Sequence, residues 1–171
     1  IKYHLKYDEW DAAIKRAEAL YANYPERYDI GLLYTDALLH KGNYQKCLAM
    51  LGKLNVLPFE GSTEGRRIYY EACIRSAMLC LDEKDFQGVI KFARLAKNWP
   101  ENLGVGKPYD VDERIENYLL SLAYQHLSNR EEADTHLMLV AAHQHPVYLD
   151  ESTGVYFQLM ALKQTKQDEK L

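Results

Sequence analysis

The chain contains few residues that interrupt a helix. It has 9 glycines and 5 prolines among 171 residues, while hydrophobic residues make up 47% and are spread throughout. A chain that carries this much apolar surface can offset the entropy of ordering, which excludes a disordered protein. Leu, Ala, Lys and Glu, which form helices well, are abundant. The composition therefore predicts a folded, mostly helical protein that is long enough to bury a core.

Cysteine is scarce too. The three cysteines, Cys47, Cys73 and Cys80, are odd in number and show no Cys-x-x-Cys spacing. Each lies among apolar residues of an expected helix, which is typical of buried thiols. Cys73 and Cys80 share a helix face, but no second pair completes the four-ligand set that zinc prefers. We therefore expect neither a metal site nor a cofactor.

The chain also lacks a strong net charge and a long apolar run. Its 21 Lys and Arg against 25 Asp and Glu give a net charge of −4, which leaves no basic stripe for nucleic acid or anionic lipid. No apolar run approaches the roughly 18 residues that span a bilayer. We expect no nucleic-acid partner and no membrane partner. The chain begins with Ile rather than Met and shows no signal peptide, so we expect a piece of a longer protein, with a cytoplasmic location favoured.

The stretch from His40 to Leu51 shows how the chain is organised. A helix is predicted to end near His40, Gly42 and Asn43 turn the chain, and a second apolar-periodic run starts at Tyr44. Gly42 lies where a left-handed C-terminal cap is needed, and Asn43 can cap the helix that follows. Similar turn and capping residues before and after this stretch predict a series of helical hairpins.

Apolar residues at spacings of three and four predict the helices along the chain. They are expected over residues 10–24, 29–41, 44–54, 66–81, 86–98, 112–127 and 130–145 and from about 152, after a helix tail at 1–7. Pro25 ends one of them, because proline cannot continue a helix. The predicted N-caps are Asp8, Asp85, Asp110 and Asn129, the last two with Glu113 and Glu132 at capping-box spacing.

The second helices of the hairpins start at corresponding positions. Trp10, Tyr44, Phe86 and Arg130 are separated by 34, 42 and 44 residues, which is the period of a helix pair with insertions in the loops. A single hairpin cannot bury its apolar face, so neighbouring hairpins must stack. We predict an all-α fold, a right-handed α-α superhelix of about four hairpins with a closing C-terminal helix. It is expected to be one domain over 1–171, with repeats at 1–26 (partial), 27–60, 64–100 and 110–146 and the closing helix at 151–167.

Four short patterns in these repeats resemble the tetratricopeptide repeat. They are W-x-x-A at 10–13, G-N-Y-x-x-C-L at 42–48, D-F-x-x-V-I at 85–90 and N-R-E-E-A at 129–133, with Pro25 and Pro100 near the expected repeat ends. The resemblance covers nearly the whole chain, and it implies a solenoid that binds other proteins. The copies depart from the family pattern, because Cys47 and Val89 replace the usual alanine and Arg130 replaces the aromatic residue. The last two periods are also long.

The connector ENLGVGKPYD, residues 101–110, is the longest irregular stretch. It is similar to one in the helical-repeat region of large, uncharacterised multidomain bacterial proteins, where it accompanies a β-rich domain of carbohydrate-related fold. That likeness implies the C-terminal repeat region of such a protein. Gly104, Gly106 and Lys107 suggest a phosphate loop, but Glu101 and Pro108 stand where a P-loop needs Gly and Ser or Thr. We therefore predict a plain interhelical loop.

In tetratricopeptide repeats, the first helix of each pair lines a concave wall. The resemblance therefore implies a protein-binding face made of Asp29, Leu32, Asp36, Leu39, His40, Glu71, Ile74, Met78, Leu81, Asp82, Ile115, Tyr118, Leu122, Gln125 and His126. This mixture of apolar and acidic residues suits an extended or helical segment that carries Lys or Arg. The Lys, Asn and Arg set by which chaperone-binding members of the family hold a terminal carboxylate is missing.

No pattern of catalytic residues stands out. His136 and His143 lie seven apart on one predicted helix, with His145 near its end, but no HExxH-type carboxylate accompanies them, and no GxSxG nucleophile motif is present. We predict a non-enzymatic module for protein–protein interaction or scaffolding, which contacts a protein, a peptide segment or another domain of its own chain. The alternative is an accessory helical domain that supports a carbohydrate-related domain elsewhere in a longer chain. Self-association is a third possibility.

Overall fold

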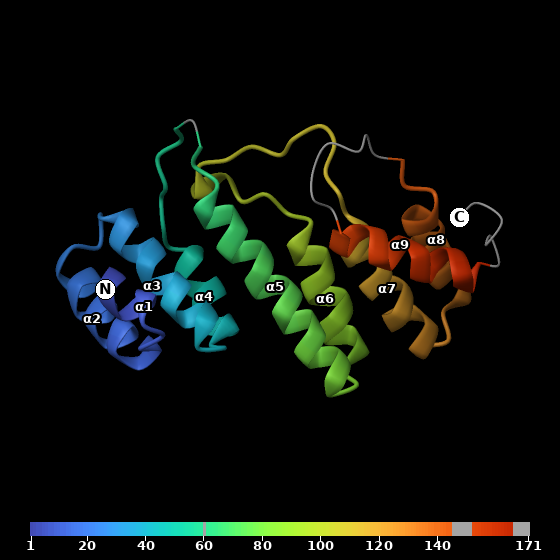
Figure 1. Ribbon diagram of the computed structural model, residues 1–171, viewed down its shortest axis with the longest axis horizontal. Helices are drawn as coiled ribbons and strands as arrows, with labels where there is room; N and C mark the ends of the chain where they lie inside the picture. Colours follow the sequence, from blue (N-terminus) through green and yellow to red (C-terminus); the bar gives the residue numbers. More distant parts are fainter. Residues whose placement is uncertain (60, 145–151, 166–171) are drawn as a thin grey trace. The chain divides into compact units, whose positions relative to one another are not determined.

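The computed structural model describes residues 1–59, 61–144 and 152–165 (Figure 1). Within these residues all regular secondary structure is helical, which confirms the predicted all-α class. The helices are α1 (Lys2–Lys6), α2 (Trp10–Asn23), α3 (Tyr28–His40), α4 (Tyr44–Leu51), α5 (Glu64–Asp82), α6 (Phe86–Ala96), the 3-10 turn η1 (Glu101–Leu103), α7 (Arg114–His126), α8 (Arg130–Ala141) and α9 (Ser152–Gln164).

The chain forms two compact units. Unit 1 comprises Ile1–Ser76 and Asn98–Lys107, and unit 2 comprises Ala77–Lys97 and Pro108–Leu171. One boundary falls inside α5 and the others fall at the two ends of the segment 98–107. The connector after α6 therefore begins in unit 2, passes through unit 1 and returns.

Consecutive helices pack against one another in both units, as a series of hairpins requires. In unit 1, α3 packs on α2 and on α4; in unit 2, α7 packs on α6 and α8, and α9 packs on α7 and α8. Burial of one large aliphatic side chain contributes about 1.5–3 kcal/mol, so the unit 1 core supplies most of that unit's stability. Its buried members include Leu32, Tyr34, Leu38, Leu39, Cys47, Leu51, Leu54, Ile68 and Leu103. The unit 2 core includes Tyr118, Leu137, Val140 and Ala161.

Three of the predicted helix ends are confirmed. Gly42 follows α3 with a φ of +83°, a conformation that favours glycine because no Cβ clashes there. The carboxylate of Asp85 accepts a hydrogen bond of 2.9 Å from the Gly88 backbone N–H and so caps α6. The side chain of Asn129 accepts one of 3.3 Å from the Glu132 backbone N–H and caps α8.

Two predicted caps at the other helix starts make no side-chain hydrogen bond. The N-cap of α2 is Glu9, because Asp8 turns into the left-handed region with a φ of +57°, and the prediction that Asp8 caps α2 was wrong. Asn43 occupies the N-cap position of α4, but its side chain accepts no capping hydrogen bond. Both helices are therefore anchored by the packing of their apolar faces rather than by their caps.

The predicted capping box at Asp110 and Glu113 is also wrong. Helix α7 starts at Arg114, with Glu113 as an N-cap that makes no side-chain capping bond. Asp112 provides the local order instead. Its Oδ1 accepts hydrogen bonds from the backbone N–H of Arg114 at 3.0 Å and from that residue's Nε at 2.9 Å. The charge-assisted hydrogen bonds between Asp112 and Arg114 fix the start of α7. The spacing of Asp110 and Glu113, on which the prediction rested, does not decide it.

The connector is part of the unit 1 core rather than a plain loop. In Figure 1 it runs beside the loop between α4 and α5, and the backbone N–H of Val56 donates to the carbonyl of Asn102 at 2.8 Å. The side-chain amide of Asn102 donates to the carbonyls of Leu51 at 2.9 Å and Leu54 at 2.8 Å. Leu51 is the last residue of α4 and Leu54 lies in the loop that follows, so Asn102 holds the end of this helix and the start of the loop. Leu103 follows and is only 1% exposed.

The connector is held on either side of η1 by specific contacts. Gly104 has a φ of +75°, and a Cβ at this position would lie 2.8 Å from the carbonyl oxygen of Val56, so only glycine fits without strain. On the other side, the guanidinium of Arg66 stacks on the ring of Trp99 at 4.4 Å, a favourable cation–π geometry for a buried arginine. These contacts attach residues 98–107 to the start of α5.

A stack between an aromatic ring and a histidine ring joins two consecutive helices in unit 1, and a similar stack does so in unit 2. Trp10, the first residue of α2, stacks on His40, the last residue of α3, with ring centroids 4.7 Å apart. Phe86, the first residue of α6, stacks on His126, the last residue of α7, at 4.4 Å. In both cases an aromatic residue that opens one helix meets a histidine that closes the next helix. Trp10 and Phe86 are two of the positions that the sequence aligned as starts of second helices.

Candidate functional site

The predicted binding face in unit 1 lies on α3 and the first part of α5, and its residues differ in exposure. Asp29 and His40 are exposed at the two ends of α3, Asp36 lies between them, and Leu32 and Leu39 are buried. Leu39, at 1% exposure, belongs to the core. We call the set Asp29, Leu32, Asp36, Leu39, His40, Glu71 and Ile74 the α3–α5 face.

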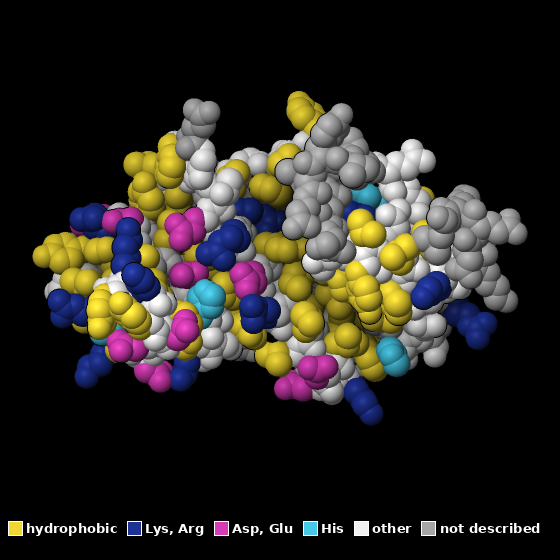
Figure 2. Space-filling model, viewed as in Figure 1, with side chains coloured by type: hydrophobic (Ala, Val, Ile, Leu, Met, Phe, Trp, Pro, Cys, Tyr) yellow, Lys and Arg dark blue, Asp and Glu magenta, His cyan; other side chains and the backbone are white. Residues whose placement is uncertain are grey.

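Arginines that sequence reasoning missed neutralise the acidic residues of this face. Arg67 pairs with Asp36 at 3.1 Å and with Glu71 at 3.3 Å, and Arg75 pairs with Glu71 at 2.7 Å. His40 lies 3.7 Å from Asp36. Figure 2 shows side chains of both charges, together with histidine, gathered over α3 and α5. The α3–α5 face is therefore of mixed charge rather than acidic.

These ion pairs can exchange partners. The side chains of Arg67 and Arg75 are about half exposed, at 51% and 49%, and pairs of this kind contribute only about 0–1 kcal/mol each. A ligand group of either sign can therefore replace one side of a pair at little cost. Sequence signals could have found Arg67 and Arg75 as the (i, i+4) partners of Glu71, but not the pairing of Arg67 with Asp36, which depends on how α3 and α5 pack.

The remaining residues of the predicted concave face belong to unit 2. Met78 and Asp82 near the end of α5 are exposed, and Leu81 is partly exposed. On α7, Gln125 and His126 are exposed, and Ile115 and Leu122 are partly buried, while Tyr118 belongs to the unit 2 core. The exposed members gather at the C-terminal ends of these two helices.

A pocket of about 290 Å³ opens beside the α3–α5 face in unit 1. It contains Asp29 and Leu32 of the predicted face, and Phe59, from the loop before α5, forms another wall. The Phe59 side chain is 61% exposed, which is unusual for a large aromatic residue in water. We call this cavity the Phe59 pocket. Its lining is completed by Lys2, Tyr28, Leu33, Gly61, Ser62, Glu64 and Gly65.

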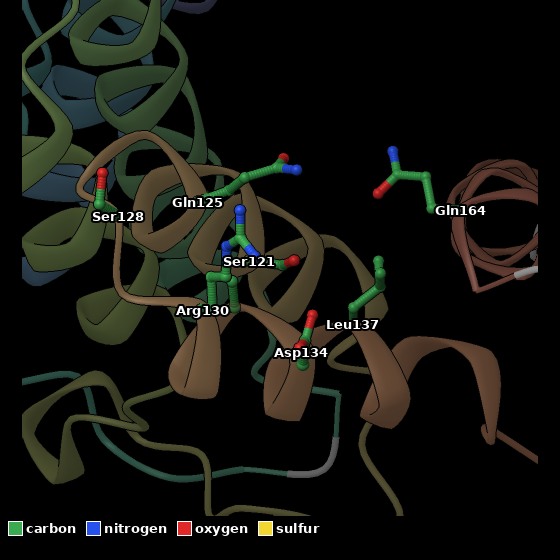
Figure 3. A pocket seen from close by; sticks show the side chains of 8 residues that line it. Ser121, Gln125, Ser128, Arg130, Asp134, Leu137 and Gln164 are labelled. Carbon is green, nitrogen blue, oxygen red and sulfur yellow. The ribbon is translucent and has the colours of Figure 1, made fainter.

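A second pocket, of about 500 Å³, lies in unit 2 where α7, α8 and α9 meet. Figure 3 shows Arg130, Asp134 and Leu137 rising from α8 toward the open space, while the amide ends of Gln125 and Gln164 approach it from α7 and α9. We call this cavity the Arg130 pocket. Its lining is Ser121, Gln125, Ser128, Arg130, Ala133, Asp134, Leu137 and Gln164. Of these residues the sequence analysis had placed only Gln125 at a binding face.

Unit 2 also contains a polar network between α6, α7 and α8. Lys97 donates to the Asn117 side-chain oxygen at 2.7 Å and lies 3.2 Å from the Glu113 carboxylate. A ring nitrogen of His136 lies 3.0 Å from the same Asn117 oxygen. Glu116 nearby is 1% exposed, and its burial raises the pKa of its carboxyl to about 7.

This network contains the kinds of titratable group that proton-transfer sites use, but its geometry is that of a packed core. Burial lowers the pKa of His136 and raises that of Glu116, so both side chains favour their neutral forms. With Glu116 almost completely enclosed, a substrate cannot reach its carboxyl. The network is therefore better described as a hydrogen-bonded junction between helices than as a catalytic site.

The cysteines and histidines that the sequence analysis considered as metal ligands do not converge. Burial raises the pKa of Cys73 to about 12 and also raises the pKa of Cys80, so both thiols of the pair considered favour the protonated form, which is a poor ligand. Among the residues that the structure describes, no three His, Cys, Asp or Glu side chains come together in a way that could hold a metal ion. His136 belongs to the network above, and His145 lies outside the described residues.

The residues that the structure describes form an all-α protein with one pocket in unit 1 and another in unit 2. Within residues 1–59, 61–144 and 152–165, none of the helices combines the length and the hydrophobicity that crossing a bilayer requires. Comparisons with protein-family models, with curated proteins and with solved structures found no match to this chain.

Proposed function

We propose that the chain is a non-enzymatic protein-interaction module, and that a partner protein binds the α3–α5 face with one apolar side chain in the Phe59 pocket. The observation that carries this proposal is the position of the pocket. It shares Asp29 and Leu32 with the face that the family resemblance implied, and it adds an exposed aromatic wall at Phe59. Apolar pockets next to polar surface are where interfaces concentrate their binding energy.

The chemistry of the face suggests the kind of partner. Asp29 and Glu64 line the Phe59 pocket, which favours a Lys or Arg next to the apolar anchor. The Asp29 carboxylate accepts hydrogen bonds from Arg27 at 2.9 and 2.7 Å, but both side chains are more than half exposed, so a basic ligand group can replace Arg27 at a cost of about 0–1 kcal/mol. Further along the face, the exchangeable pairs of Arg67 with Asp36 and Glu71 can accommodate side chains of either charge. An extended or helical segment with an apolar residue beside a basic one therefore fits this surface best.

We also propose that the hairpins belong to a right-handed superhelix of the tetratricopeptide type. The stacks of Trp10 on His40 and of Phe86 on His126 support this, because they join the same kinds of position in two hairpins. The packing of consecutive helices from α1 to α4 and from α6 to α9 is also consistent with it. A solenoid of this kind presents an extended surface to its partners.

Peptide selection followed by substitution tests the interaction. Peptides selected from a random library on the whole chain should bind the F59A and D29K variants at least about fivefold more weakly, because truncation of a central contact costs about 1 kcal/mol or more. The L57A variant is the matched control, since Leu57 is as exposed as Phe59, at 62%, but does not line the pocket. A library that yields no binder, or binders that F59A and D29K leave unchanged, would refute the proposal.

One observation favours the alternative of an accessory domain. Helices α8 and α9 expose apolar side chains, among them Leu139, Val155 and Tyr156, at 53%, 45% and 58% exposure. Surface of this kind suits packing against another domain of a longer chain or against a second copy. A carbohydrate-related neighbour remains an inference from the connector's likeness to other proteins.

A further inference from the structure

The Arg130 pocket contains polar groups that the proposed interaction does not use. Its volume of about 500 Å³ falls within the range of about 300–1,000 Å³ that is typical of small-molecule sites. The lining combines two opposite charges, four uncharged polar side chains and two apolar ones. All of them belong to unit 2, whereas the Phe59 pocket lies in unit 1.

The two charged residues of this pocket are not satisfied by the protein. Arg130 and Asp134 lie one turn apart on α8, so their Cβ atoms are about 5–6 Å from each other. Among the described residues, neither side chain has a hydrogen bond or an ion pair, and they do not pair with each other. A guanidinium and a carboxylate thus lie side by side at one cavity, each able to accept a ligand group of opposite charge.

The hydroxyl of Ser121 adds a further polar group to the cavity. Ser121 is only 5% exposed, yet its side chain has no hydrogen-bond partner among the described residues and faces the cavity from α7. Solvent still reaches its Oγ, because this atom is not among the buried side-chain atoms that lack a partner, so a ligand in the pocket can take the place of water at this hydroxyl. Gln125 and Gln164 add amides that can both donate and accept.

The apolar part of the lining is small and lies on the α8 side. Ala133 and Leu137 follow Arg130 and Asp134 along the same stripe of α8 and are both at least nine-tenths buried. They offer a short hydrophobic surface next to the paired charges. This arrangement matches a ligand that carries a carboxylate and an ammonium group on one carbon and a side chain beyond them.

From these contacts we infer that the Arg130 pocket binds a zwitterionic small molecule, a free α-amino acid or a dipeptide. The ligand carboxylate binds the guanidinium of Arg130, and the ligand ammonium binds the carboxylate of Asp134. Ser121, Gln125 and Gln164 complete the hydrogen bonds, and the ligand side chain rests on Ala133 and Leu137. Because the charges face solvent and are screened, we expect a dissociation constant on the order of 1 mM.

The test uses the whole chain labelled with ¹⁵N and the common L-amino acids, each added singly. At least one of them should produce saturable shifts of the side-chain amide signals of Gln125 and Gln164. The deaminated and the decarboxylated analogues of the best binder should each bind at least about tenfold more weakly, because each lacks one charge-assisted hydrogen bond. No saturable shift with any amino acid, or equal binding of an analogue, would overturn the inference.

Substitution separates this site from general charge effects. The R130Q and D134N variants should each weaken binding about tenfold. Both side chains are exposed, so circular dichroism should show an unchanged fold. The E131Q variant is the matched control, because Glu131 is exposed on the same helix but does not line the pocket. Wild-type affinity in both R130Q and D134N, or pocket shifts that appear on concentrating the protein without ligand, would show that the cavity serves another purpose.

Discussion

Replacement of Glu116 by Gln should stabilise the protein at neutral and alkaline pH. Burial raises the pKa of this carboxyl from its ordinary value of 4.5 to about 7 in the folded chain. Between these two values the folded state keeps a proton that the unfolded state has lost. The stability contributed by Glu116 is therefore present at low pH and is lost as the pH rises toward 7.

The magnitude follows from the two pKa values. A tenfold difference in proton affinity corresponds to about 1.4 kcal/mol, so a change from 4.5 to about 7 corresponds to about 3 kcal/mol of unfolding free energy. Gln has nearly the same shape as Glu and carries no charge to desolvate. The E116Q variant should therefore exceed the wild type by up to about 3 kcal/mol at about pH 8, with the difference falling to near zero at about pH 4.5.

The measurement is urea unfolding, monitored by circular dichroism, at several pH values between these limits. His136 titrates in the same unit with the opposite sign. Burial lowers its pKa below 6.5, so stability falls as the pH drops through that value. The difference between E116Q and the wild type removes this contribution, because both proteins retain His136. The E83Q variant controls for the loss of one negative charge at an exposed turn.

A constant difference between E116Q and the wild type across the pH range would contradict the reasoning. So would a variant that is less stable than the wild type at about pH 8 while E83Q is unchanged. Either result would mean that the ionised carboxylate is stabilised by its neighbours more strongly than burial destabilises it.

Two further predictions concern the connector and the buried thiols. The G104A variant should lose about 1–3 kcal/mol of unfolding free energy, because alanine is strained at positive φ and its Cβ would press on the Val56 carbonyl. The control G106A should stay within about 0.5 kcal/mol, since nothing lies near that position; equal urea midpoints for the two variants would contradict the role of Gly104. Cys47 and Cys73, whose thiol pKa values burial raises to about 12, should react with Ellman's reagent only after unfolding. Rapid labelling of native protein in a C80S background would show that a thiol is accessible.

Much of the secondary structure could be predicted because its causes are local. The apolar spacing of three and four residues located the helices, and Gly42 and Asp85 located helix ends through contacts within a few residues. The prediction of a helix start failed where a neighbouring side chain formed stronger hydrogen bonds than the predicted cap. Asp112 binds Arg114 and sets the start of α7, so the capping spacing at Asp110 had no effect.

The candidate sites depended on contacts between residues far apart in the sequence. Arg67 neutralises Asp36 only because α3 and α5 pack with their charged faces together. The sequence placed Asp36 on a face but could not supply its partner. In the same way, Gln164 of α9 and Arg130 at the start of α8 line one cavity although they are far apart in the sequence.

The sequence by itself determined that this chain is built from successive amphipathic helices, since a helical period and a cap are properties of a few neighbouring residues. Tertiary structure decided which side chains are buried and which remain available. Asn102 binds the end of α4, and Glu116 is enclosed although its residue type favours water. The physical reason is that burial and pairing depend on the distances between helices, which only the packing of the whole unit determines.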